Sequence, residues 1–300
     1  MPELREVLLT QFGAHLLAAK RHVEIADLFS SPLARSGGLT ASMHFALGLA
    51  FMELKRFEDA AQQMRHCLAK RSLRVLSPVN KDIRKAGPHY CLALCLDRLN
   101  HPAEAEKAFR AALAEEPELR PLRLDFVRFL SGQGQPVEAL KSLHQLVSEK
   151  ADEPAVWLLG GEIALRQRGL FEFAADWTGE AVKFLPGEAA VQFQRAHALL
   201  VNRQFKAALA VLRQWPAPEN AGQRATLAVC EILSGGEGDP LPEALEPAAS
   251  REFLQWYRGL LGAGADDLIK ELNVKVSDLA RVLPSAAPVL EAALLAASQA

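Results

Sequence analysis

The sequence is poor in the side chains that build β-sheets and in cysteine. Its 300 residues include only 2 Tyr and 4 Trp, whereas half of all residues are hydrophobic, with alanine and leucine prominent. Ala and Leu lose little conformational freedom in helices, so the composition favours a helical protein with a substantial core. Four cysteines are too few for a disulfide scaffold in a chain of this length, which indicates a reducing compartment, and we expect a cytoplasmic protein.

Long apolar runs and an excess of one charge are missing as well. No run of about 18 apolar residues occurs, and Met1-Pro2-Glu3 opens the sequence without the basic and apolar regions of a signal peptide. The 34 basic side chains nearly balance the 36 acidic ones. We therefore expect no membrane segment, and no binding to nucleic acid or to an anionic membrane surface.

An alanine recurs at nearly constant spacing through the first two thirds of the chain. These marker alanines are Ala26, Ala60, Ala105, Ala139, Ala174 and Ala208. Their intervals are 34, 45, 34, 35 and 34 residues, and a period of 34 fits two helices of about 13 residues with two short turns. We expect small residues of each first helix to lie opposite the marker alanines, where the helix axes approach closely. Those small residues are Gly48, Ala93, Gly161 and Ala196.

This frame resembles the tetratricopeptide repeat family over residues 7–216, as six helix–turn–helix units. The resemblance implies an all-α fold, an α-solenoid of antiparallel helix pairs wound into a right-handed superhelix. We assign 1–216 to the repeats, with a short second helix in the first unit and one extra residue in the fifth. Pro117 and Pro186 are expected to end second helices. Residues 217–300 are assigned to a degenerate repeat and a C-terminal helical cap, because solenoids need terminal elements that cover the last apolar face.

The interval of 45 predicts an insertion at about residues 72–85. Turn signals at Ser77-Pro78 and Gly87-Pro88 indicate an extended connector or a lengthened helix end. The stretch from Arg65 to Lys85 is basic, with Asp82 as its one acid. Two interpretations stay open: a solvated helix face, or a site for an acidic or phosphate-bearing partner. Nucleic acid fits the second poorly, since the stretch has no aromatic side chain for stacking.

Motifs for catalysis and metal binding are missing from the sequence. It contains no phosphate-binding loop, serine-hydrolase elbow or zinc-protease helix. Cys91 and Cys95 share one face of a helix, but zinc needs two further ligands nearby, so we expect buried thiols that act as small hydrophobes. We predict no enzyme activity, no cofactor and no metal site.

The family resemblance further implies that the first helices line a concave groove. The residues placed there are Phe45, Leu49, Met52, Tyr90, Leu94, Arg98, Leu124, Arg128, Leu158, Glu162, Phe193 and His197. The Lys and Asn pattern with which some family members clamp a terminal carboxylate is not present. A mainly apolar groove with a few charges suits an amphipathic helix or an extended hydrophobic segment. A peptide partner, a second copy of the chain or the C-terminal helices could each cover it.

We therefore predict a scaffold for protein–protein interaction that binds a protein or peptide segment in this groove. Self-association through the solenoid ends is compatible with this prediction. The alternative is a non-catalytic accessory or regulatory module of a bacterial glycosyltransferase. Trp157, Gly160-Gly161 and residues 173–181 resemble the helical tails that follow family-2 glycosyltransferase domains.

Overall fold

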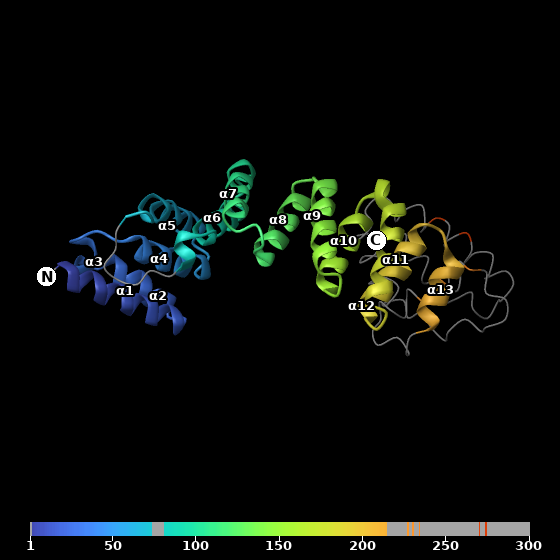
Figure 1. Ribbon diagram of the computed structural model, residues 1–300, viewed down its shortest axis with the longest axis horizontal. Coiled ribbons are helices and arrows are strands. Elements are labelled where there is room, and N and C mark those ends of the chain that lie inside the picture. The colour runs from blue at the N-terminus through green and yellow to red at the C-terminus, as the bar shows by residue number, and fades with distance from the viewer. Residues whose placement is uncertain are drawn as a thin grey trace. The chain divides into compact units, whose positions relative to one another are not determined.

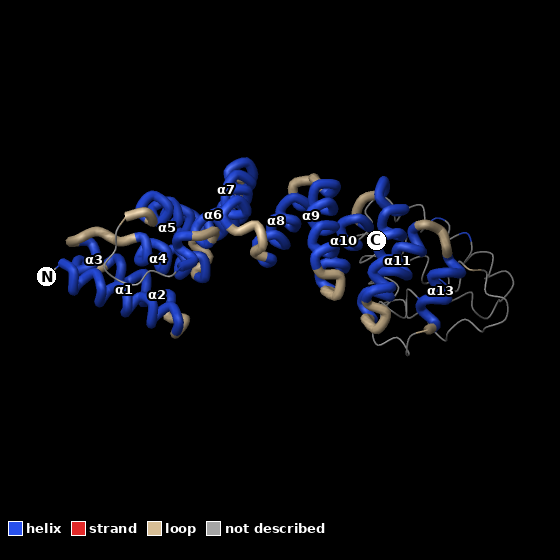
Figure 2. Tube along the Cα trace, viewed as in Figure 1, coloured by secondary structure: helices blue, strands red, loops and turns tan. Residues whose placement is uncertain are grey.

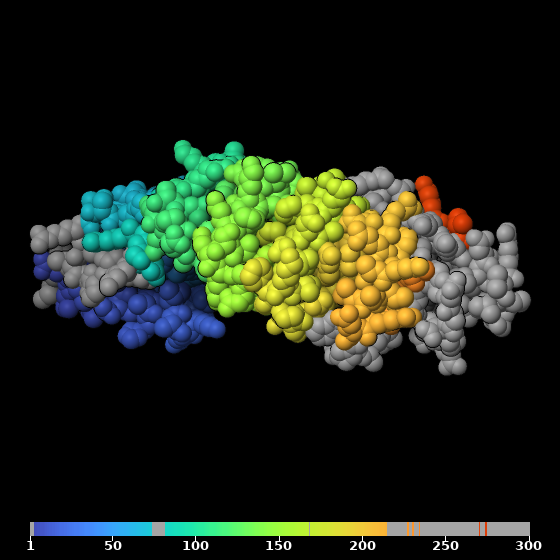
Figure 3. Space-filling model, turned by 45° about the vertical axis from the view of Figure 1, so that its right-hand side comes forward, coloured from blue at the N-terminus to red at the C-terminus, as the bar shows by residue number. Residues whose placement is uncertain are grey.

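The computed structural model describes residues 2–73 and 81–214, together with the single positions 227, 230, 234, 270 and 274. The described residues form thirteen α-helices and two short 3-10 helices, and no strand (Figure 2). The helices group into two compact units, residues 1–135 and residues 136–300. Within each unit the helices follow one another in chain order (Figures 1 and 3). The predicted all-α repeat architecture is confirmed.

The first unit contains three helix pairs and the first helix of a fourth. Its elements are α1 (Pro2–Ala18), α2 (His22–Ser30), α3 (Pro32–Arg35), α4 (Ala41–Glu53), α5 (Phe57–Lys70), η1 (Lys81–Arg84), α6 (Gly87–Arg98), α7 (Pro102–Glu115) and α8 (Arg120–Gly132). Each second helix contacts its own first helix and also the first helix of the next pair, as α5 does with α4 and α6.

The second unit repeats this arrangement. Its elements are α9 (Pro136–Glu149), α10 (Pro154–Leu165), η2 (Arg168–Leu170), α11 (Phe171–Phe184), α12 (Ala189–Val201) and α13 (Phe205–Arg213). The predicted C-terminal cap, residues 217–300, lies outside the described residues apart from five single positions.

Five of the six marker alanines are fully buried. Each is the fourth residue of a second helix, and the five are Ala60, Ala105, Ala139, Ala174 and Ala208. The first unit differs, because α2 begins at His22 and its fourth residue is Ile25. Ile25 is fully buried, whereas Ala26 is only half-buried. Ile25, not Ala26, is therefore the position equivalent to Ala60. The first repeat is 35 residues long when it is measured between these two equivalent positions, one more than the predicted interval of 34.

The small residues of the first helices do lie at close approaches, but not all of them face the marker alanine. A Cβ added to Gly48 would lie 2.6 Å from Cε of Met64, four residues beyond Ala60 on α5. A Cβ on Gly161 would clash with the side-chain amide of Gln194 on α12, the first helix of the next repeat. Gly160 is the residue that faces the paired second helix, because a Cβ there would clash with the indole ring of Trp177. Glycine at these positions lets neighbouring helices approach closely.

The turns between first and second helices share one backbone geometry. In five repeats, the residue two before the second helix has a positive φ of 57° to 72°; these residues are Lys20, Lys55, Asn100, Gly134 and Arg203. The next residue donates its N–H to a carbonyl five residues back, as Arg56 does to Phe51 at 2.8 Å. This is the Schellman ending of a helix, which satisfies its last carbonyl groups. The fifth repeat replaces this turn with η2, where its extra residue is accommodated.

The described part of the insertion is a connector, not an extension of α5. That helix has 14 residues, the same length as α7, α9 and α11, and ends at Lys70. The described chain continues at Lys81 with η1. Gly87 and Pro88 then form the start of α6 and not a separate turn. Pro117 and Pro186 each follow the end of a second helix by two residues, as predicted.

Candidate functional site

First helices of successive repeats lie beside one another within each unit. In residues 1–135, α1 contacts α4 and α4 contacts α6, and a hydrogen bond from Tyr90 to Asp125 joins α6 to α8. In residues 136–300, α10 contacts α12, and Nε2 of Gln194 donates to the carbonyl oxygen of Leu158 at 2.8 Å. We call the surface formed by these helices in each unit the first-helix face.

A polar network on α6 and α8 is the best-defined feature of this face. The phenol of Tyr90 donates to the carboxylate of Asp125, and Nη1 of Arg128 lies 2.7 Å from the other oxygen of the same carboxylate. Burial, followed by the hydrogen bond to Asp125, raises the pKa of Tyr90 well above its usual range. Tyr90 therefore stays a protonated donor, and the network holds its two helices in a defined register.

The structure brings two predicted groove residues, Tyr90 and Arg128, together through a residue that was not predicted. Asp125 follows Tyr90 by 35 residues, and Gln194 follows its partner Leu158 by 36. These separations are one repeat length, so both pairs join corresponding parts of neighbouring first helices. A search for polar residues about one period apart could have found Tyr90 and Asp125, but not Gln194, which binds the backbone of Leu158.

The other predicted residues of the first unit differ in exposure. Leu49, Met52, Leu94 and Leu124 are half-buried and Arg98 is exposed. Phe45 is only 7% exposed, and its ring atom Cζ lies 3.4 Å from the position that a Cβ would take on Gly87, at the start of α6. Phe45 is therefore part of the packing between α4 and α6.

In the second unit, Leu158, Glu162 and Phe193 are half-buried, whereas His197 is 3% exposed. The Phe193 ring meets the His197 ring edge-on, with centroids 4.3 Å apart. Burial lowers the pKa of His197 to about 3, so the imidazole is neutral at physiological pH. Glu162 pairs with Arg166 at 2.5 Å on its own helix.

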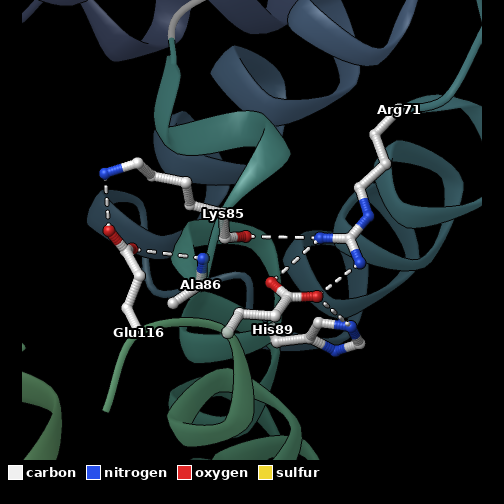
Figure 4. Close-up of polar contacts among 6 residues, drawn as sticks. Arg71, Lys85, Ala86, His89 and Glu116 are labelled. Carbon is white, nitrogen blue, oxygen red and sulfur yellow. Dashed lines mark hydrogen bonds and ion pairs between the residues drawn. The ribbon is translucent and has the colours of Figure 1, made fainter. Parts of the chain in front are cut away.

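Two side chains of the basic stretch, Arg71 and Lys85, bind acidic residues of the same unit (Figure 4). Arg71 forms two hydrogen bonds with the carboxylate of Glu115, at 2.5 and 3.1 Å. Lys85 lies 2.7 Å from Glu116, which also accepts the backbone N–H of Ala86 at 3.2 Å. The hydrogen bond to Glu115 raises the pKa of Arg71, and the one from Lys85 lowers the pKa of Glu116. These contacts attach both ends of the insertion to the end of α7.

The described cysteines of the repeats are protonated thiols in or near the core. Cys67 and Cys95 are fully buried, and Cys91 is half-buried. Burial raises their pKa values to about 12, 11 and 12 respectively. Across the described ranges, no cluster of three metal-ligating side chains is found. None of the helices in these ranges combines the length and the apolar character that crossing a bilayer requires.

The residues behind the alternative resemblance have structural contacts. The indole N–H of Trp157 donates to the carbonyl of Ala151 at 2.7 Å, and that of Trp177 donates to the carbonyl of Trp157 at 2.8 Å. The two rings pack with centroids 4.8 Å apart. These tryptophans hold α10 and α11 together, and the glycosyltransferase interpretation stays a prediction.

Comparison with known proteins agrees with the fold. A family model described as tetratricopeptide repeat matches residues 98–163. The chain is similar to the C-terminal part of a tetratricopeptide repeat-containing protein from Cytophaga hutchinsonii, with 13% identity over 88% of this chain and 94% of that one and a TM-score of 0.58. It is also similar to a tetratricopeptide repeat protein from Parabacteroides merdae, with 11% identity over 91% and 99% of the two chains and a TM-score of 0.51. No curated relative matches the chain.

Proposed function

We propose that this tetratricopeptide repeat chain is a non-enzymatic scaffold whose first-helix face on α6 and α8 binds an apolar protein segment carrying acidic residues. The network of Tyr90, Asp125 and Arg128 carries the proposal. It fixes two neighbouring helices before any partner arrives, and a preorganised surface lowers the ordering cost of binding.

The same pattern of side chains occurs on both helices. Leu94 and Arg98 lie one helical turn apart on α6, and Leu124 and Arg128 lie one turn apart on α8. Each leucine is half-buried and each arginine is exposed. Apolar side chains of a bound segment would contact the leucines, and its carboxylates would meet the arginines. The basic stretch is a poorer site for such a segment, because Arg71 is bound to Glu115 through both Nη atoms and is only 23% exposed. Arg128 binds Asp125 through Nη1 alone and is 57% exposed, so its other N–H groups can still reach a partner.

Selection from a phage-displayed peptide library on the full chain tests this proposal. We expect selected peptides that combine apolar and acidic residues. The double variant Arg98→Glu, Arg128→Glu should weaken their binding, measured by fluorescence polarisation, by about tenfold or more, because two charges of the site are reversed.

The matched control is Lys107→Glu, Lys141→Glu, which makes the same charge change at exposed positions of the second helices α7 and α9. It should change the affinity by less than about twofold, the residual effect expected of distant, screened charges. Equal affinity of the site variant and the wild type would contradict the proposed site.

A further inference from the structure

The first helix of the chain carries an apolar stripe that the structure leaves exposed. Leu4, Leu8 and Phe12 are 56%, 59% and 53% exposed. They are spaced by four residues and so follow one side of α1. The adjacent side of the helix, with Leu9, Gly13 and Leu16 about 100° around from the stripe, is buried against the rest of the unit. We call Leu4, Leu8 and Phe12 the α1 stripe.

Later first helices bury the positions that correspond to Leu8 and Phe12 of this stripe. The turn after each of these first helices contains a hydrogen bond from an N–H to a carbonyl five residues back, and the residue that accepts it marks an equivalent position in each repeat. These residues are Leu16 in α1, Phe51 in α4, Leu96 in α6 and Leu130 in α8. In this alignment Leu8 and Phe12 correspond to Met43 and Leu47 in α4, to Pro88 and Leu92 in α6, and to Leu122 and Phe126 in α8, all of which are buried.

A helix covers these positions in the later repeats. The second helix of the preceding pair packs there, as α2 does on α4 and α7 on α8. The ring of Phe109 on α7, for example, lies 5.5 Å from that of Phe126 on α8, centroid to centroid. The α1 stripe is therefore a surface of the kind that this fold covers with an apolar helix.

We propose that two copies of the chain pair through α1, antiparallel, with Leu8 at the two-fold axis. Leu4 and Phe12 lie at equal distances along the helix on either side of Leu8. An antiparallel pair would therefore place Leu4 of each copy beside Phe12 of the other, and Leu8 beside Leu8. A two-fold contact requires this kind of self-complementary surface.

The helix dipole and the placement of charged side chains on α1 are compatible with an antiparallel pair. Its first turn is acidic through Glu3 and its last turn is basic through His15. Antiparallel packing opposes the two helix dipoles favourably, and Glu3, about 140° around the helix from Leu8, stays outside the contact. Arg5 is directed away from such a contact, since its guanidinium donates to the carbonyl oxygens of Leu33 and Ala34, both at 2.6 Å. The guanidinium therefore does not interrupt the α1 stripe.

Sedimentation velocity of the full chain over about 1 to 200 µM tests the pairing, since a contact carried by one helix per copy is small and should depend on concentration. We expect a monomer–dimer equilibrium in the wild type. Leu8→Glu should raise the dimer dissociation constant at least about tenfold, because it places two like charges at the axis. The control Val137→Glu changes an apolar residue of similar exposure, 55%, on α9 and should leave the equilibrium unchanged. A wild type that is monomeric throughout, or a Leu8→Glu variant that dimerises normally, would overturn the proposal.

Disulfide trapping tests the two-fold arrangement independently of any charge effect. Under mild oxidation, Leu8→Cys should form a covalent dimer, whereas the wild type, with its native cysteines, should not. Leu4→Cys and Phe12→Cys should cross-link when mixed but far less when each is alone. Failure of Leu8→Cys to cross-link, or preferential self-linking of Leu4→Cys, would exclude an antiparallel pair centred on Leu8.

Discussion

His44 illustrates how burial sets the charge of a single side chain. Its Nδ1 lies 2.8 Å from Oε1 of Gln63, and its Nε2 lies 3.2 Å from Nζ of Lys70, which also donates to the carbonyl of Leu39. The arrangement fits a neutral imidazole that donates through Nδ1 and accepts at Nε2. Burial lowers the pKa of His44 to about 4, and the nearby charge of Lys70 acts in the same direction.

This pKa predicts a loss of stability in acid. His44 takes up a proton near pH 6.5 in the unfolded chain but only near pH 4 in the folded chain. The stability that depends on a neutral His44 is therefore fully present above pH 6.5 and is lost as the pH falls towards 4. The loss is on the order of 3 kcal/mol. We expect His44→Gln to reduce the pH dependence of the free energy of unfolding between pH 7 and 4.5, measured by urea denaturation.

His66 supplies the control for this experiment. Its ring centroid is 5.1 Å from that of His44, but its side chain is exposed. The variant His66→Gln should therefore retain most of the wild-type slope. The same slope in wild type and His44→Gln would show that His44 is not the group responsible.

The turn between the paired helices is the element that recurs most regularly. Only Gly134 among the five left-handed residues is glycine; the others are two lysines, an asparagine and an arginine. A side chain in this region costs roughly 1 to 2 kcal/mol. In the four repeats without glycine there, the packing of the second helix on its first helix holds the backbone in this conformation. Sequence patterns could not indicate three of the five turns, because Lys and Arg, unlike Gly and Asn, carry no preference for a positive φ.

Alanine substitutions at two glycines near the end of α8 can distinguish the effect of backbone conformation on stability from the effect of packing. Gly134 has φ of 72°, whereas Gly132 is helical, and a Cβ would meet no atom within 4 Å at either position. Gly134→Ala should destabilise the chain by about 1 kcal/mol or more, and Gly132→Ala should stabilise it by about 0.4 to 1 kcal/mol. Thermal or urea denaturation would measure both. A shift of the same sign in the two variants would contradict this account of the turn.

At the scale of the whole molecule, the numbers of basic and acidic side chains nearly balance, and several of these charges also pair within the first unit. Arg71 and Lys85, at the two ends of the insertion, are paired with Glu115 and Glu116 within the first unit, and Arg65 lies 2.9 Å from Glu104. These acidic residues offset the positive charge of the three basic side chains. On the first-helix face, Arg98 and Arg128 are exposed beside half-buried leucines, and Arg128 also pairs with Asp125.

The two proposed surfaces occupy different helices, so they should act independently. Leu8 lies on α1, which packs mainly on α2 and α4, while Arg98 and Arg128 lie on α6 and α8. Changes at sites without shared partners usually add. We expect Leu8→Glu to leave the affinity for selected peptides unchanged, and Arg98→Glu, Arg128→Glu to leave dimer formation unchanged. Fluorescence polarisation and sedimentation of both variants would check this, and a joint loss would indicate one shared surface.

The helical class, the repeat length, the ends of several helices and five buried alanines could all be predicted before any coordinates were known. These features depend on residues within one helix pair, where small and large apolar side chains must alternate for the helices to pack. That the first helices form one face was also predicted from the sequence, but this prediction came from the family resemblance and not from the spacing of the residues.

The availability of individual residues on that face became clear only from the folded chain. Phe45 and His197 are buried, Tyr90 is tied to Asp125, and the register of the first repeat runs through Ile25. The exposure of a side chain depends on what a helix about 35 residues away places against it, and a pattern along one helix does not contain that information. For the same reason, Leu8 of α1 and Leu122 of α8 are the same kind of residue in the sequence, yet one is exposed and the other buried.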